Sequence, residues 1–175
     1  MTKKNTIPVF ILMLVFLLSG NSLLAEDKPA PANVAADMTT KLLKMENKTS
    51  QAGDITIYVM GDPDVAAILE ELIGMEIGKS KIDKITMGDD LPKTKPTVLF
   101  IGDESKVDKA VEYTRAEKIL SVTGIPNLIS KGVSLGIGIS ETLNFKIIIN
   151  LPASNQEGLD WNPAILKLAT VIEDE

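Results

Sequence analysis

Apolar residues recur along the chain at two different spacings, and this pattern predicts an alternation of strands and helices. The segment ITIYVM (55–60), rich in β-branched residues, predicts a buried strand. Apolar residues at helical spacing follow it and predict a helix that closes at Gly74. The same strand–helix order begins again at residue 97. Four strands are predicted in this part of the chain, over residues 55–60, 81–87, 97–101 and 119–123.

Two Gly-Asp pairs, Gly61-Asp62 and Gly102-Asp103, end equivalent strands of these units. Each aspartate can accept a hydrogen bond at the start of the helix that follows. Strands that alternate with helices are typical of a largely parallel sheet with helices on both faces. Right-handed crossovers would place both Gly-Asp turns at one edge of that sheet.

The segments before and after this region follow different patterns of apolar residues. Residues 32–47 carry a narrow apolar stripe at helical spacing, which predicts an amphipathic helix on the outside of the core. Further elements are predicted after residue 123: a short helical turn (125–129), a β-hairpin (133–139 with 145–150) and two short helices (152–158 and 163–172). The predicted fold is a three-layer α/β sandwich with a mixed, mostly parallel, Rossmann- or flavodoxin-like sheet, a C-terminal hairpin and a helix.

The N-terminus has the layout of a secretory signal peptide. Lys3 and Lys4 precede an uncharged apolar run over 7–18, and Ala25 is a small residue at the expected cleavage point. An uncleaved anchor is the alternative, but the run is shorter than the ~20 residues that span a bilayer. No cysteine follows the run, so a lipid anchor is excluded. We expect a signal peptide (1–25), a flexible or extended leader (26–33), one domain (34–172) and an acidic tail (173–175).

Composition excludes several kinds of chemistry. The chain has neither cysteine nor histidine, which removes thiol nucleophiles, Ser-His-Asp triads and structural zinc knuckles. Its formal charge is −6, and loss of Lys3 and Lys4 with the signal peptide would make it more negative. Such a chain is not expected to bind nucleic acid. An exported domain without cysteine suits a bacterial envelope, so we expect a periplasmic or secreted location.

Five residues are candidates for ligand or partner binding. Asp62 and Asp103 would face a ligand at the carboxyl ends of strands, although two helix N-caps are the favoured interpretation. Thr123 and Asn127 would wall the same crevice. Trp161, the only tryptophan, is either an exposed partner anchor or a wedge between the last two helices. No cofactor and no metal are expected.

Two further groups suggest sites by composition alone. Asp89-Asp90 can supply metal oxygens, but the pair lacks an EF-hand ladder and a solvated turn is favoured. The glycines of 132–138 do not match a phosphate-binding loop. They indicate a bulge or a close backbone approach within a strand.

Four stretches, taken in order, resemble the YfiR family of bacterial periplasmic proteins, also called HmsC-like. The stretches are ITIYVMGDPDVAAILEEL (55–72), PTVLFIGDES (96–105), ILSVTGIPNLISKGVSLGIGI (119–139) and FKIIINLPASNQEGLDWNPAILKLATVI (145–172). The likeness extends over residues 36–172. Two departures mark a divergent member: 45–48 reads MENK where the family often has an aromatic-Trp-Pro segment, and the cysteine pairs of better-studied members are absent.

The resemblance implies regulation without catalysis. The characterised members that this chain resembles look like periplasmic repressors of an inner-membrane diguanylate cyclase. By holding the cyclase inactive, such repressors lower cyclic-di-GMP synthesis and biofilm formation. We therefore expect an inner-membrane signalling partner, a cyclase or a sensor kinase, with homodimerisation left open. This hypothesis predicts an exposed apolar patch and no polar pocket. The alternative is an envelope sensor that binds a small ligand in a crevice walled by Gly61, Gly102, Thr123 and Asn127, and an enzyme is the least favoured class.

Overall fold

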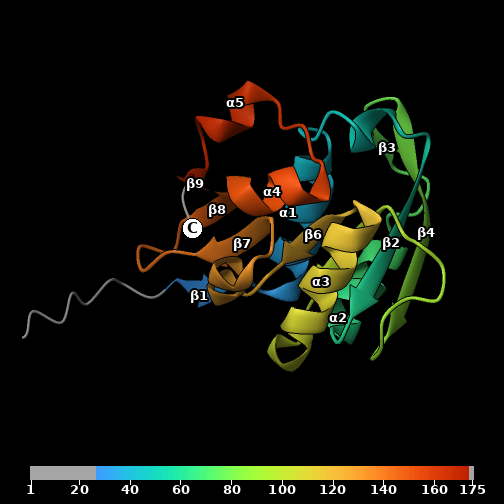
Figure 1. Cartoon of the computed structure of the whole chain (residues 1–175), viewed down its shortest axis with the longest axis horizontal. Coiled ribbons are helices and arrows are strands. Elements are labelled where there is room, and N and C mark those ends of the chain that lie inside the picture. The colour runs from blue at the N-terminus through green and yellow to red at the C-terminus, as the bar shows by residue number, and fades with distance from the viewer. Residues whose placement is uncertain (1–26, 174–175) are drawn as a thin grey trace, which may run out of the picture.

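The computed structural model describes residues 27–173, which form one mixed sheet with helices on both faces (Figure 1). The predicted signal peptide lies outside the described residues. The strands are β1 (Lys28–Pro29), β2 (Asp54–Met60), β3 (Glu76–Ile77), β4 (Ser80–Gly88), β5 (Val98–Ile101), β6 (Leu120–Thr123), β7 (Leu135–Ile139), β8 (Phe145–Asn150) and β9 (Thr170–Ile172). The α-helices are α1 (Ala32–Leu43), α2 (Pro63–Glu70), α3 (Val107–Glu117), α4 (Leu151–Glu157) and α5 (Pro163–Leu166). Short 3-10 helices are η1 (Thr49–Gln51), η2 (Glu104–Lys106) and η3 (Pro126–Lys131).

The sheet has the order β3-β4-β2-β5-β6-β7-β8-β9, with β1 paired to β7. The pairs β2·β4, β2·β5, β5·β6, β6·β7 and β8·β9 are parallel, whereas β3·β4, β7·β8 and β1·β7 are antiparallel. This confirms the predicted mixed, mostly parallel α/β sheet and the predicted β7–β8 hairpin. Within residues 27–173, no helix combines the length and the apolar character that a membrane span requires.

Helices cover both faces of the sheet, as Figure 1 shows with α3 and α4 in front. Buried side chains of α1 and α2 form one core with β2 and β4, and those of α3 form a second core with β5 and η3. The expected peripheral position of the first helix is wrong. Ala35, Ala36 and Leu43 of α1 are almost fully buried; the two small alanines let the helix lie close to the sheet, and Leu43 fills the core beside them.

The end of the chain differs from the predicted helix over 163–172. The helix α5 stops at Leu166, and Thr170–Ile172 pair in parallel with Ile148–Asn150 of β8. All three residues of β9 are β-branched, which favours a strand, and the edge of β8 offers unpaired backbone groups. The apolar spacing of this segment fits a helix and a strand equally well, so the pattern alone misled the prediction.

The beginning of the domain is also tied into the sheet. In the predicted leader, Lys28 and Pro29 pair with Ile139 and Gly138 of β7, so this part is extended and ordered. A Cβ on Gly138 would lie 2.5 Å from Pro126 Cγ and 3.3 Å from the Lys28 carbonyl oxygen. The glycines of β7 therefore permit close approach of β1 and η3, as the sequence indicated.

Candidate functional site

The two predicted strand-end aspartates cap local structure. Asp62 accepts a hydrogen bond from the Val65 backbone N–H (3.0 Å) and caps α2. Asp103 accepts from both the backbone N–H (2.9 Å) and the hydroxyl (2.7 Å) of Ser105, and its other oxygen lies 3.1 Å from Lys106 Nζ. These bonds, led by the Ser105 hydroxyl, lower the pKa of Asp103. Both carboxylates are thus occupied by helix-start contacts.

The two Gly-Asp turns pack directly on each other. A Cβ on Gly61 would lie 2.6 Å from Asp103 Cβ, and a Cβ on Gly102 would lie 2.3 Å from Asp62 Cβ. Each glycine therefore makes room for the aspartate of the other turn. Because the turns touch in this way, there is no space between them for a ligand.

The other two residues of the predicted crevice do not face a shared cavity. Thr123 is fully buried, and its hydroxyl donates to the Ile101 carbonyl oxygen (2.8 Å) and accepts from the Ile125 N–H (3.1 Å). Asn127 is exposed and lines a shallow hollow of about 540 Å³ beside β1. Thr123 therefore has a structural role, and Asn127 belongs to a different surface.

Trp161 is buried, with 7% of its surface exposed, so the exposed-anchor interpretation is wrong. Its indole N–H donates to the Ser154 hydroxyl of α4 (2.9 Å), and its side chain belongs to the core on the α1 side of the sheet. The indole thereby links α4 to the segment that enters α5. This position agrees with the other interpretation of the sequence, in which Trp161 packs between the last two helices.

Glu46, inside the MENK segment that departs from the family pattern, holds two distant parts of the chain together. Its side chain is fully buried. One carboxylate oxygen accepts from the Thr49 N–H (2.6 Å) and the other from the Asp160 N–H (2.7 Å). A backbone bridge between Glu46 and Trp161 reinforces this link. The segment thus joins the end of α1 to the α4–α5 connection.

A second buried carboxyl, Glu157, lies at the end of α4 with 1% of its surface exposed. Its Oε2 accepts from the Ser121 N–H (3.0 Å) and the Ser134 hydroxyl (2.6 Å). Within the described residues, its Oε1 has no hydrogen-bond partner. Burial raises the pKa of Glu157, while the hydrogen bonds from Ser121 and Ser134 act in the opposite direction. The group joins α4 to β6 and β7 and is closed to solvent.

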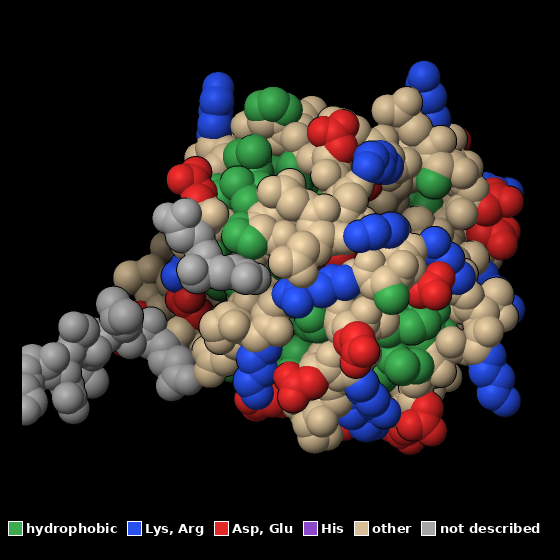
Figure 2. Space-filling model, viewed as in Figure 1, with side chains coloured by type: hydrophobic (Ala, Val, Ile, Leu, Met, Phe, Trp, Pro, Cys, Tyr) green, Lys and Arg blue, Asp and Glu red, His purple; other side chains and the backbone are tan. Residues whose placement is uncertain are grey.

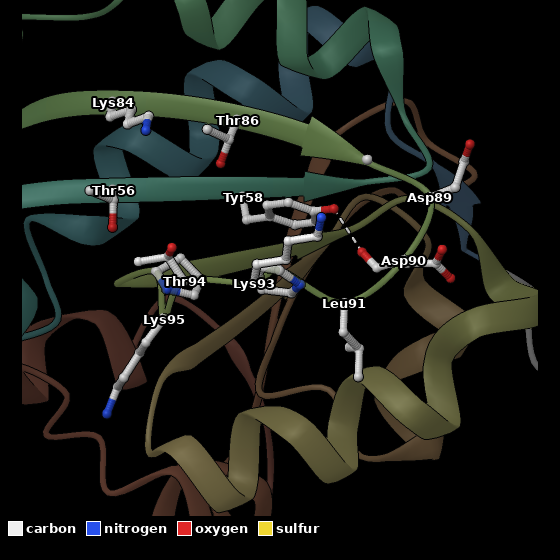
Figure 3. A pocket seen from close by; sticks show the side chains of 13 residues that line it. Thr56, Tyr58, Lys84, Thr86, Asp89, Asp90, Leu91, Lys93, Thr94 and Lys95 are labelled. Atoms are coloured by element: carbon white, nitrogen blue, oxygen red, sulfur yellow. Dashed lines mark hydrogen bonds between the residues drawn. The ribbon is translucent and has the colours of Figure 1, made fainter.

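A cavity with a mixed polar and apolar lining lies on β2 and β4, where a loop instead of a helix covers the sheet. It has a volume of about 470 Å³, and Figure 3 shows its lining. Thr56 and Tyr58 come from β2, Lys84, Thr86 and Gly88 come from β4, and the β4–β5 loop supplies the rest. The loop residues are Asp89, Asp90, Leu91, Pro92, Lys93, Thr94, Lys95 and Pro96. We call this cavity the β2/β4 pocket.

Hydrogen bonds and ion pairs hold the loop over the pocket. The Tyr58 hydroxyl donates to the Asp90 carbonyl oxygen (2.7 Å), the bond drawn in Figure 3. Burial, followed by the charges of Asp90 and Asp89, raises the pKa of Tyr58, so the phenol stays a donor at neutral pH. Asp89 pairs with Lys106, the last residue of η2 (3.1 Å), and Asp90 pairs with Lys109 in the first turn of α3 (3.3 Å).

The Asp89-Asp90 pair is therefore engaged with lysines, in line with the favoured solvated turn. Among residues 27–173, no group of three or more acidic residues is arranged to hold a metal ion. Glu46, Glu157 and the β2/β4 pocket were not among the candidates predicted from the sequence. One signal was available: Thr56, Tyr58, Lys84 and Thr86 place polar side chains on one face of two interior strands, which is unusual in a sheet covered on both sides.

Comparison with known proteins agrees with this architecture. A solved structure of a conserved domain protein from Vibrio cholerae O1 biovar El Tor strain N16961 superposes with a TM-score of 0.56 at 14% identity, which shows a shared fold. The match covers 83% of this chain and 61% of that one. No curated protein sequence matches the chain. Residues 39–170 match the model of the YfiR/HmsC-like family, which spans most of the domain. The chain therefore belongs to the YfiR/HmsC-like family.

Proposed function

We propose that this protein is exported by its residues 1–25 to the bacterial periplasm and acts there as a non-enzymatic regulator. Its partner would be the periplasmic part of an inner-membrane signalling protein, a diguanylate cyclase or a sensor kinase. The observation that carries this proposal is the family match over residues 39–170. Regulation of a cyclase would in turn adjust cyclic-di-GMP and biofilm formation.

The chemistry of the described residues supports a binding role. The carboxyl with the raised pKa, Glu157, is 1% exposed, and its Oε2 accepts structural hydrogen bonds from Ser121 and Ser134. The strand-end turns, where α/β sheets usually bind ligands, are packed against each other. Figure 2 shows basic and acidic side chains interspersed over the face formed by α3 and α4, which supports no nucleic-acid role.

The tip of the β7–β8 hairpin is the surface best suited to contact the partner. Leu143 is 75% exposed and adopts a positive φ of 61°, and Phe145 beside it is 62% exposed. A leucine in the left-handed region lowers the stability of the folded protein by about 1–2 kcal/mol. Because the side chain is exposed, no apolar contact in the free protein offsets this loss. Glycine or asparagine would be favoured at such a turn position. A bound partner would recover the apolar contact that the free protein lacks.

The mechanism would be a shift of population. A regulator that binds the inactive conformation of a cyclase more tightly than the active one holds the cyclase inactive. No chemistry at the hairpin is needed for this effect. Release of the regulator would restore cyclase activity.

The test is capture of partners from the native envelope by crosslinking to the tagged full-length protein, followed by mass spectrometry. We expect the wild type to recover an inner-membrane cyclase or kinase. The Leu143→Asn variant should recover much less of it, although asparagine should stabilise the free protein by about 1 kcal/mol. Loss of binding together with gain of stability would separate a contact role from a structural role.

Leu168→Asn is the matched control, because Leu168 is also 75% exposed but follows α5. It should leave recovery of the partner unchanged. Equal loss in both variants would remove the hairpin from the proposal. Capture of this chain alone by the wild type would overturn the regulator proposal and indicate a homodimer.

A further inference from the structure

We propose that the β2/β4 pocket binds a small anion whose phosphate or carboxylate group is attached to a flat apolar body. This inference goes beyond the regulator role, because it concerns a small molecule and a different surface. The hairpin belongs to β7 and β8, whereas the pocket lies across β2 and β4, with β5 and β6 between them in the sheet.

The pocket exists because the helical layer is incomplete. On the face that carries Thr56 and Tyr58, α3 packs against β5 and β6, and only the β4–β5 loop extends over β2 and β4. The space beneath this loop is about 470 Å³, within the roughly 300–1,000 Å³ typical of small-molecule sites. A packed interior would have filled such a space with side chains.

The lysines that line the pocket favour an anionic ligand. Lys84 and Lys93 line the pocket, and within residues 27–173 neither has a carboxylate within 4.0 Å of its ammonium group. The two acidic residues of the lining are drawn toward lysines outside the pocket: Asp89 pairs with Lys106, which it shares with Asp103, and Asp90 pairs with Lys109. A protein with a formal charge of −6 thus places two uncompensated cations on one cavity.

Polar and apolar lining together indicate a mixed ligand. The hydroxyls of Thr86 and Thr94 can donate to an oxyanion or to oxygen atoms of the ligand. The ring of Tyr58 with Leu91 and Pro92 supplies an apolar wall, and an aromatic ring gives a flat body an offset-stacking surface. In Figure 3, Thr56 and Thr86 point from the strands toward the loop, while Lys95 points away. Lys95 instead approaches Glu117 at 3.9 Å.

The loop is held in the position that such a ligand needs. The Tyr58–Asp90 hydrogen bond fixes its first part, and Thr56 and Thr97 bond reciprocally through backbone and hydroxyl groups at its end. Both ends are therefore anchored to β2. A preformed site loses less conformational entropy on binding than a mobile one.

The experiment uses saturation-transfer NMR on the complete mature protein, residues 26–175. Phenyl phosphate, benzoate and inorganic phosphate serve as anionic probes. Phenol serves as the uncharged analogue. We expect saturable binding of phenyl phosphate or benzoate, weaker binding of inorganic phosphate, and no saturable binding of phenol. Phenyl phosphate above benzoate would indicate a phosphate ligand, and the reverse order a carboxylate. Raised salt should weaken the binding of either anion.

A double variant, Lys84→Gln with Lys93→Gln, should reduce the affinity for the preferred probe at least tenfold. The matched control, Lys44→Gln with Lys167→Gln, changes the net charge equally at two exposed lysines outside the pocket. It should bind as the wild type does. Circular dichroism checks that all variants fold. Equal affinities of the two double variants, or no saturable binding of any anion to the wild type, would overturn the proposal. The measurement needs no partner, so its failure leaves the regulator role untouched.

Discussion

The two buried glutamates should differ in how well they tolerate the same isosteric substitution. Glu46 uses both carboxylate oxygens, one for the Thr49 N–H and the other for the Asp160 N–H. Glutamine has only one carbonyl oxygen, so Glu46→Gln turns an amide NH2 toward a backbone N–H. Loss of one charge-assisted hydrogen bond alone should lower the free energy of unfolding by about 1.5–3 kcal/mol.

Glu157 differs because a single oxygen, Oε2, accepts both of its hydrogen bonds. The carbonyl oxygen of glutamine can accept the same two bonds, from Ser121 and Ser134. Its NH2 would occupy the position of Oε1, which has no partner among the described residues. The substitution also removes the cost of burying a charge. We expect Glu157→Gln to be tolerated at neutral pH far better than Glu46→Gln.

The pH dependence follows from the raised pKa of Glu157. Between the ordinary carboxyl pKa and the raised folded-state value, the folded protein holds more protons than the unfolded chain. The stability of the wild type therefore falls as pH rises through that interval, by up to about 1.4 kcal/mol for each pH unit. Glu157→Gln lacks this titration, so its stability relative to the wild type should improve as pH rises.

Urea unfolding followed by far-ultraviolet circular dichroism from pH 4 to pH 8 measures these differences. The fluorescence of Trp161, the only tryptophan, gives a second probe of the same transition. If the stability of Glu157→Gln runs parallel to that of the wild type across this range, Glu157 does not titrate as argued. If Glu46→Gln is neutral, its two hydrogen bonds do not support the fold.

Five further substitutions, at four positions, test the packing. Gly102→Ala would place its Cβ 2.3 Å from Asp62 Cβ, and we expect a loss of about 1–3 kcal/mol on thermal unfolding. Asp62→Ala should cost about 0.5–2 kcal/mol through the lost helix cap, whereas Asp62→Asn should cost less in the same assay. Trp161→Ala should lower stability by about 3–5 kcal/mol in urea, and Ser154→Ala, which removes only the acceptor of the indole N–H, by about 1 kcal/mol.

Local patterns were sufficient to predict most of the sheet. The segment 55–60 carries β-branched residues and ends at a glycine and a capping aspartate, so propensity, burial and turn chemistry agree on one strand. The hairpin was equally clear, because its turn separates two apolar runs. The segment Thr170–Ile172 was not, since its apolar spacing suits either a helix or a strand and the open edge of β8 decides between them.

The site could not be predicted from local patterns. Glu46 bonds to Asp160, and a glutamate at the end of a helix is usually solvated, so only the tertiary contact shows that it is buried. The β2/β4 pocket depends on a loop that replaces a helix over part of one face. The polar residues of β2 and β4 indicated an uncovered face, but the position of Lys93 follows from the path of the loop.

The two proposed surfaces should act independently of each other. Between the β2/β4 pocket and the β7–β8 hairpin lie β5 and β6, whose residues are all buried, and a packed sheet has no second arrangement to transmit a signal. We therefore expect phenyl phosphate to leave recovery of the partner unchanged, and Leu143→Asn to leave phenyl phosphate affinity unchanged. A change in either quantity would contradict the rigid-sheet argument. In that case the coupling must be reciprocal, and purified partner would alter phenyl phosphate affinity by the same factor.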